Sequence, residues 1–456
     1  MKQEIPVKEK QKYVMTIDDI GVHGEGIGRI DGYTVFVEGA LPGEKVRIRV
    51  SKAGRNHGYG KLLDIVVPSP DRVLPPCPYT GRCGGCTLQH ISYNRQLQFK
   101  TRRVRDALER IGKITGVTVH NTVGMDQPWR YRNKAQFPVR MEDGLLSIGF
   151  FAPGSHDIVD IDRCLIQHET GDNVIEIIRK FILKYNVPVY DEQTHRGIIR
   201  HVVTRMGFKS GQLMVAIVTN GRNLPHSDKL VGLLTTNIPN ITSIVQNIND
   251  RKTNVILGNE NITLWGQGHI VDTLAGLTFK ISPLSFYQVN PVQTEILYGK
   301  VMEYAALTGR ETVIDLYSGI GTISLFLARN AGKVYGIEEV PQAVEDAWEN
   351  AKLNHISNVE FITGKAEELI PKLVDSGLHA DVVVLDPPRK GCEDEVLEAL
   401  GHMIPQRIVY VSCNPATLAR DLKFLTERGY KVEELQPVDM FPHTPHVETV
   451  VLIEKE

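Results

Sequence analysis

From residue 281 onward, short apolar runs rich in β-branched residues alternate with helical stretches, and this alternation restricts the fold more than any other feature. It is typical of a doubly wound parallel sheet. The clearest unit is residues 408–422, IVYVSCNPATLARDL, where a strand stops at Pro415 because proline cannot continue a sheet ladder. Cys413 is therefore predicted at the sheet edge where ligands bind. It could be a small buried hydrophobe or a nucleophile.

A glycine-containing turn earlier in this region predicts a nucleotide-like ligand. A strand over residues 312–317 is followed by Ser-Gly-Ile-Gly and a helix over 322–329, so backbone amides can approach a ligand at a helix N-terminus. The next strand places Glu338 at its end, 23 residues after Asp315, where an acid can bind ribose hydroxyls. These features predict an adenosine-bearing cofactor, with NAD and S-adenosylmethionine both open.

Two further strand ends bring charged groups to the same edge. Residues 381–389 read DVVVLDPPR, and the two prolines fix a rigid turn that presents Asp386 and Arg389. Both are expected at the same sheet edge as the cysteine. A strand over 447–453 is expected at the margin of the sheet, with Glu448 near its start.

Four cysteines outside this region predict a metal site. Residues 77–86, CPYTGRCGGC, contain three of them, and a fourth lies in IDRCLIQ; they are Cys77, Cys83, Cys86 and Cys164. Close cysteines with a distant fourth, in a chain that we expect to be intracellular, indicate metal ligation rather than disulfides. Thiolates suit zinc or an iron–sulfur cluster, and the single C-x2-C pair favours [4Fe–4S]. With four cysteines every iron can be ligated, which argues against a radical enzyme.

A basic block lies within a chain whose formal net charge is only -2. Residues 95–140 contain eleven Lys and Arg against three Asp and Glu, which indicates a phosphate-facing surface or a solvated helix face. Trp129, Arg132 and Lys134 belong to WRYRNK, where aromatic and basic residues alternate as in proteins that bind single-stranded RNA. Aromatic rings buried under a sheet would give the same pattern. We predict these three residues to be RNA contacts.

The patterns divide the chain into four segments. Residues 1–12 are polar and Lys-rich, and we predict a mobile tail. Residues 13–68 carry short apolar runs between glycine-rich turns, typical of a small OB-like β-barrel. Residues 69–280 begin with a proline-rich linker and should form an α+β domain that holds the cysteine site, with a helix near 93–111 that can pack on the catalytic domain. Residues 281–456 should form a Rossmann-like doubly wound domain.

Together the motifs resemble those of the RNA (uracil-5-)-methyltransferases, which use S-adenosylmethionine. The resemblance rests on FYQVN, DLYSGIGT, LDPPRKG, SCNPATLARDL and FPHTPHVE, and with the barrel and the four cysteines it covers nearly the whole chain. It looks most like the 23S ribosomal RNA branch of Gram-positive bacteria, whose members carry an RNA-binding TRAM barrel and a [4Fe–4S] cluster. The tRNA branch typically lacks both. Gly24, Gly26 and Gly28 match the TRAM pattern.

The resemblance implies a role for each matching residue. Cys413 looks like the nucleophile that adds to C6 of uracil, and Glu448 looks like the base that removes the C5 proton after methyl transfer. The implied S-adenosylmethionine contacts are Gln288, Tyr317, Glu338 and Asp386, and the implied cluster ligands are Cys77, Cys83, Cys86 and Cys164. Thr322 stands where related enzymes can have asparagine, and Cys392 matches no functional position.

The implied function is therefore methylation of a flipped-out uridine in a loop of 23S rRNA. We expect a cytoplasmic monomer without a membrane span or an obligate protein partner. The alternatives are a tRNA (uracil-5-)-methyltransferase, a 5-methylcytosine methyltransferase and a non-catalytic iron–sulfur protein that binds RNA. The intact set of site residues argues against the last.

Overall fold

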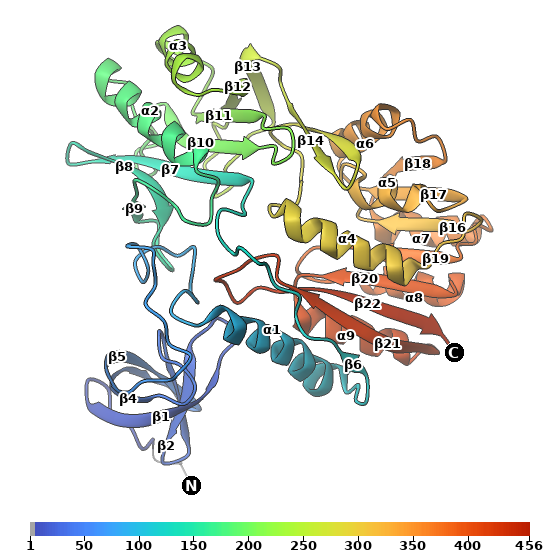
Figure 1. The fold of residues 1–456 in the computed structure, drawn as a ribbon, viewed down its shortest axis with the longest axis horizontal. Helices are drawn as coiled ribbons and strands as arrows, with labels where there is room; N and C mark the ends of the chain where they lie inside the picture. Colours follow the sequence, from blue (N-terminus) through green and yellow to red (C-terminus); the bar gives the residue numbers. More distant parts are fainter. Residues whose placement is uncertain (1–4) are drawn as a thin grey trace.

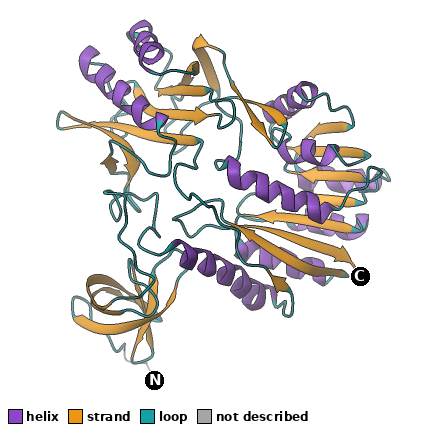
Figure 2. Ribbon diagram, viewed as in Figure 1, coloured by secondary structure: helices purple, strands orange, loops and turns teal. Residues whose placement is uncertain are grey.

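The computed structural model describes residues 5–456. It shows an N-terminal barrel, a central α+β region and a C-terminal α/β domain (Figures 1 and 2). Residues 1–4 of the predicted tail lie outside the described residues. Val7 is buried in the barrel core, and Lys10 N donates to Val50 O at 2.8 Å, so this part of the predicted tail belongs to the barrel. In the described part of the chain no helix is long and apolar enough to cross a membrane.

The predicted N-terminal β-barrel is confirmed. Five strands close in the order β1-β2-β3-β5-β4: β1 (Lys12–Ile20), β2 (Gly26–Ile30), β3 (Tyr33–Val37), β4 (Lys45–Ala53) and β5 (His57–Val67). Alternate residues of β4 are buried, and Val46, Ile48 and Val50 fill the interior. Gly28 permits the tight approach of β2 to β1, because a Cβ there would lie 2.2 Å from the carbonyl oxygen of Thr16.

The central region is built on a seven-stranded sheet with the order β13-β12-β11-β10-β7-β8-β9. Its strands are β7 (Lys134–Glu142), β8 (Leu145–Phe151), β9 (Ile158–Asp160), β10 (Ile199–Met206), β11 (Leu213–Thr219), β12 (Ile241–Ile248) and β13 (Glu260–Gly266). The helices α2 (Thr170–Tyr185) and α3 (Ser227–Asn237) pack on it and share one hydrophobic core with it.

The C-terminal domain contains the expected doubly wound sheet, with the order β18-β17-β16-β19-β20-β22-β21-β6. Its strands are β16 (Thr312–Leu316), β17 (Lys333–Glu338), β18 (Val359–Thr363), β19 (Val382–Leu385), β20 (Arg407–Ser412), β21 (Tyr430–Val438) and β22 (Glu448–Lys455). The helices are α4 (Pro291–Ala305), α5 (Thr322–Ala328), α6 (Pro341–Leu353), α7 (Ala366–Asp375), α8 (Asp394–Met403) and α9 (Pro415–Thr426). Helices α4 to α6 pack on one face of the sheet and α7 to α9 on the other.

The strand expected at the sheet margin lies inside the sheet. β22 runs antiparallel between β20 and β21, and the short β6 (Thr118–Val119) then pairs with β21 on its outer side. The apolar run alone could not reveal this, because it does not record which strands pair on its two sides. Both edges of β22 are hydrogen-bonded within the sheet.

Two segments that precede residue 281 belong to the C-terminal domain. Helix α1 (Tyr93–Ala107) continues into one π-helical turn, Leu108–Gly112, and its Val104 and Leu108 share a core with Leu418 and Leu422 of α9. The predicted basic helix near 93–111 therefore packs on the catalytic domain. The hairpin of β14 (Ile270–Leu274) and β15 (Leu277–Ile281) also buries its apolar side chains in that domain.

Candidate active site

One cavity at the carboxyl ends of β16, β17, β19 and β20 collects the residues predicted for catalysis and cofactor binding. Its volume is about 420 Å³. The sequence-predicted residues that line it are Gln288, Tyr317, Glu338, Asp386, Cys413 and Glu448. Sequence reasoning missed other wall residues: Phe286, Tyr298, Phe441 and His446. Phe286 and the last two lie inside the FYQVN and FPHTPHVE motifs, which was the available signal.

The turn after β16 shapes the cofactor end of this cavity. Tyr317 has a φ of 68°, a left-handed conformation that is uncommon for a bulky residue and is found at ligand sites. Gly319 has a φ of 55° and nothing within 4 Å of the position of a Cβ. Its amide donates to Glu338 Oε2 at 3.0 Å, and Val340 N donates to Glu338 Oε1 at 2.9 Å. These bonds fix the acid predicted to bind a ribose.

The cavity wall has a polar group free to meet such a ligand. Ser318 lines the cavity, and its Oγ is buried without a hydrogen-bond partner among residues 5–456. Thr322 Oγ1 lies 3.1 Å from Tyr298 OH at the wall, so threonine can stand at this position. The open space at Gly319 and the unpaired Ser318 hydroxyl fit a polar ligand such as S-adenosylmethionine.

Cys413 lies where β20 ends and α9 begins, as its sequence context predicted. Asn414 caps the helix, because its side chain accepts a hydrogen bond from Ala416 N at 3.1 Å, and Cys413 is thereby held at the cavity. Burial, together with the charges of Glu448 and Asp386, raises the pKa of the Cys413 thiol to about 11, while Arg389 acts in the opposite direction.

The ionised forms of the two carboxyl groups near Cys413 are also disfavoured. Glu448 is only 5% exposed, and burial and the charge of Asp386 raise its pKa well above the usual range, against the effect of Arg389. Burial raises the pKa of Asp386 to about 7. Cys413, Glu448 and Asp386 thus line the same cavity as Arg389. A further positive charge in this cavity would favour their ionised forms.

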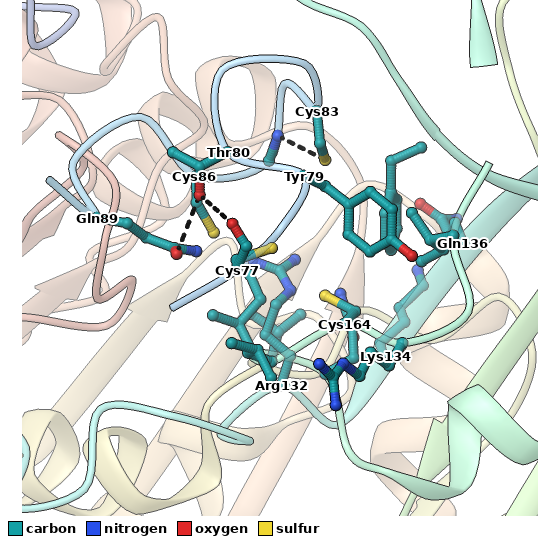
Figure 3. A pocket seen from close by; sticks show the side chains of 18 residues that line it. Cys77, Tyr79, Thr80, Cys83, Cys86, Gln89, Arg132, Lys134, Gln136 and Cys164 are labelled. Carbon is teal, nitrogen blue, oxygen red and sulfur yellow. Dashed lines mark hydrogen bonds between the residues drawn. The ribbon is translucent and has the colours of Figure 1, made fainter. Parts of the chain in front are cut away.

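A second cavity, of about 360 Å³, is lined by all four cysteines predicted as metal ligands: Cys77, Cys83, Cys86 and Cys164. Figure 3 shows them around one space, three from the loop that precedes α1 and one from the segment before α2. Gly85 N donates to the Cys83 sulfur at 3.4 Å. Within residues 5–456 no group of three or more His, Cys, Asp or Glu side chains is arranged so that it could hold a metal ion.

All four of these side chains are thiols, and thiolates are ligands for both zinc and iron–sulfur clusters. A four-iron cluster bound only by protein thiolates would need all four cysteines, and all four line this cavity.

The residues predicted as RNA contacts are placed elsewhere than on an exposed basic surface. Arg132 and Lys134 line the cysteine cavity, and Figure 3 shows both beside Cys77 and Cys164. Burial, with Arg205 and Arg132 nearby, lowers the pKa of Lys134 to about 7. Trp129 stacks on His443 with 3.8 Å between ring centroids. All three predicted residues are half-buried, and their role as RNA contacts stays a prediction.

Comparison with known proteins agrees with this geometry. Residues 92–456 match the family described as tRNA (Uracil-5-)-methyltransferase, and residues 6–63 match the TRAM domain. An RNA methyltransferase of Clostridium tetani is 52% identical, over 99% of this chain and 98% of its own length. One from Halalkalibacterium halodurans is 50% identical, over 99% of each chain.

A solved structure adds the cofactor. The Pyrococcus abyssi tRNA (uracil-54, C5)-methyltransferase in complex with S-adenosyl-L-homocysteine superposes with a TM-score of 0.78 and 30% identity, and the match covers 96% of this chain and 99% of that one. The chain belongs to the RNA (uracil-5-)-methyltransferase family. It is an S-adenosylmethionine-dependent RNA methyltransferase with a TRAM barrel, as the motifs predicted.

In this methyltransferase the segment that carries Phe441, His446 and Glu448 into the cavity is held by α1. Lys100 of α1 forms a fully buried ion pair with Asp439, and Lys100 Nζ also donates to Phe441 O at 3.1 Å. Tyr93 OH donates to Asp439 Oδ2 at 2.9 Å. The helix therefore fixes the start of the catalytic segment from outside the C-terminal half of the chain.

The cysteine region contacts the same segment. Thr87 N and Leu88 N, just after Cys86, both donate to His443 O, at 3.1 and 3.0 Å. Tyr131 OH donates to Pro442 O at 3.1 Å. The walls of the cysteine cavity and of the methyltransferase cavity are thus joined through residues 439–448.

We expect Lys100→Met to destabilise the methyltransferase by about 3–5 kcal/mol, because it leaves the Asp439 carboxylate buried and unpaired. Methyl transfer should fall as well, since residues 439–448 lose their anchor. Urea unfolding and steady-state methylation measure the two effects. Arg102→Ala is the matched control on the same helix: its exposed pair with Asp19, at 2.5 Å, should contribute less than about 1 kcal/mol. Equal effects of both substitutions would contradict the anchoring role.

Proposed function

We propose that Cys413 and Glu448 carry out covalent methylation of C5 of uracil, with Gln288, Tyr317, Glu338 and Asp386 binding the methyl donor. The observation that supports this is their convergence on one cavity. S-adenosylmethionine supplies the electrophilic methyl group and a positive charge when it is bound. A nearby cation favours the ionised forms of Cys413 and Glu448. This effect offsets burial, which disfavours the ionised form of each group.

The residues then act in sequence. The Cys413 sulfur forms a bond to C6, and the electron pair of the C5–C6 double bond moves into an enolate whose C5 is nucleophilic. After C5 has taken the methyl group, Glu448 removes the C5 proton. The electron pair left at C5 restores the double bond and expels the Cys413 thiolate, which is a good leaving group.

Substitutions of Cys413 and Glu448 should block the reaction at different steps, so the two roles can be tested separately. Cys413→Ala should abolish methylation and any covalent enzyme–RNA adduct, while cofactor binding survives. Glu448→Gln should allow addition and methyl transfer but slow proton removal, with a turnover loss of roughly 10²–10⁴-fold. A denaturation-resistant protein–RNA band that carries the methyl group should then accumulate. Normal turnover of Glu448→Gln, or adduct formation by Cys413→Ala, would contradict the assigned roles.

For the substrate, we propose a flipped-out uridine in a loop of 23S rRNA. The support is the resemblance of the complete motif set, with barrel and four cysteines, to the rRNA branch. A uridine in tRNA is the second candidate, because the Pyrococcus abyssi enzyme is named for position 54 of tRNA and its match covers 96% of this chain. A match over 96% of this chain must include at least part of the barrel. The barrel alone therefore does not distinguish the two substrates.

Transfer of labelled methyl groups onto separated, unmethylated 23S, 16S and transfer RNA tests the substrate. We expect 23S rRNA to accept methyl groups and tRNA not to, with 5-methyluridine as the product. Equal or faster transfer to tRNA would favour the second candidate. The product 5-methylcytidine would contradict the uracil assignment itself.

We also propose that Cys77, Cys83, Cys86 and Cys164 hold a [4Fe–4S] cluster with a structural role. Arg132 and Lys134 at the same cavity would balance the negative charge of a cluster held by four thiolates. The cluster would join the loop before α1 to the segment before α2, and through Thr87 and Leu88 it would support residues 439–448.

Anaerobically purified protein should be brown and contain about four iron and four sulfide per chain. Cys77→Ser or Cys164→Ser should lose the cluster and the solubility together, since the site joins distant segments. Cys392→Ser is the matched control, because Cys392 lies away from this cavity. Stoichiometric zinc without sulfide would contradict the cluster.

A further inference from the structure

Arg389 lines the methyltransferase cavity from a short loop, residues 387–392, which reads PPRKGC. We call this segment the PPRKGC loop. Arg389 is exposed, and its side chain forms no salt bridge within residues 5–456. Its charge nevertheless opposes the rise in pKa that burial causes at Cys413 and at Glu448. A side chain without a charged partner of its own is placed by the backbone that carries it, so the position of this charge depends on what holds the loop.

The helix α9 holds the PPRKGC loop by its backbone. Asn414 Nδ2 and Thr417 Oγ1 both donate to Arg389 O, at 3.1 and 3.3 Å. One turn further along the helix, Arg420 Nη2 donates to Lys390 O at 3.1 Å. Each of these bonds ends on a carbonyl oxygen of the loop. They fix the loop backbone on α9 and leave the Arg389 guanidinium unpaired.

Asp421 is the buried group at the centre of these contacts. Its side chain does not reach solvent, and it accepts hydrogen bonds from Cys392 N at 2.9 Å, Tyr410 OH at 2.6 Å and Arg420 Nε at 2.7 Å. One carboxylate thus ties the end of the loop to β20 and α9. The approach is so close that a Cβ at Gly391, where φ is 83°, would lie 2.6 Å from Asp421 Oδ2.

The stability of the surrounding core gives no reason for a carboxylate at this position. Asp421 does not line the methyltransferase cavity, and its partner Tyr410 belongs to the apolar core beneath α7 to α9. A hydrophobic residue of similar size would avoid the cost of burying a charge there. What the carboxylate provides is acceptor oxygens for the loop and for the arginine that also holds the loop.

We propose that Asp421 is a positioning residue for the methylation reaction, because it fixes the PPRKGC loop on α9 and thereby holds the Arg389 guanidinium beside Cys413. The charged groups that face the Cys413 thiol are Arg389 from the loop, Asp386 from the end of β19 and Glu448 from β22. Arg389 is the cation among them, and an opposite charge favours the thiolate. The proposal rests on the proposed role of Cys413 as nucleophile and adds what keeps that thiol reactive.

Alkylation of Cys413 by iodoacetamide tests this, because the thiolate is the reacting form and neither RNA nor methyl donor is needed. Mass spectrometry of the peptide that contains Cys413 separates it from the other cysteines. At pH 8, Asp421→Asn should slow the reaction by about 3- to 30-fold, the range expected when a thiol loses a neighbouring positive charge. Arg389→Ala should slow it by a similar factor. The double variant should be no slower than Arg389→Ala, since both changes act through one charge.

Glu427→Gln is the matched control. It removes the same charge just beyond the end of α9, where Glu427 forms an exposed pair with Lys423 at 3.8 Å, and its alkylation rate should equal that of the wild type. Arg420→Ala is a second variant in case Asp421→Asn does not fold. Its side chain is half exposed, and its loss frees the same loop, so Cys413 should again react more slowly.

A wild-type alkylation rate in either folded variant, Asp421→Asn or Arg420→Ala, would overturn the proposal. So would a double variant in which the effects of Asp421→Asn and Arg389→Ala multiply. Thermal unfolding of each variant identifies a purely structural role, which would lower the melting temperature and leave the alkylation rate unchanged. Methyl transfer onto RNA is measured separately, so failure of the proposed methylation would leave the alkylation result readable.

Discussion

The buried ion pair between Lys100 and Asp439 is the interaction on which the active site depends. Neither side chain reaches solvent, and each would be very costly to bury alone. The pair fixes the start of the segment that delivers Phe441, His446 and Glu448 to the cavity. It also ties α1, which adjoins the barrel and the cysteine loop, to the catalytic sheet. The barrel, the cysteine loop and the catalytic sheet therefore meet at one junction.

The convergence of the candidate catalytic and cofactor residues on one cavity could be predicted because their positions follow from local rules. Cys413, Glu338 and Asp386 each stand at or just beyond the carboxyl end of a parallel strand, and such ends meet at one edge. Glu448 was placed correctly in the cavity although its strand was expected at the sheet margin. β21 directly precedes β22 in the chain and folds back onto it, whereas β6 comes from the first third of the chain and pairs with β21. No local pattern records the second pairing.

Other features could not be predicted from the sequence, because they depend on which part of the chain packs against a given surface. The alternation in WRYRNK fixed which side chains share a face but not what that face meets. That face lines the cysteine cavity, where Arg132 and Lys134 are half-buried. Contacts between distant strands were also hidden: only the parallel pairing of β3 with β5 brings Phe36 beside His57 and Tyr59 in the barrel. The ion pair of Lys100 with Asp439 could not be predicted either, because its two partners are 339 residues apart in the sequence.

The position of α1 also has a consequence for folding during synthesis on the ribosome. Lys100 and Asp439 are 339 residues apart, and α9, which covers the apolar face of α1, is made almost as late. At about 5–20 residues per second, roughly 17–70 s pass between the synthesis of the two partners. Throughout that time Val104 and Leu108 lack the α9 residues that later cover them. Only the finished barrel and the growing central sheet are present to shield them from aggregation. The catalytic domain can close only when the last residues have emerged.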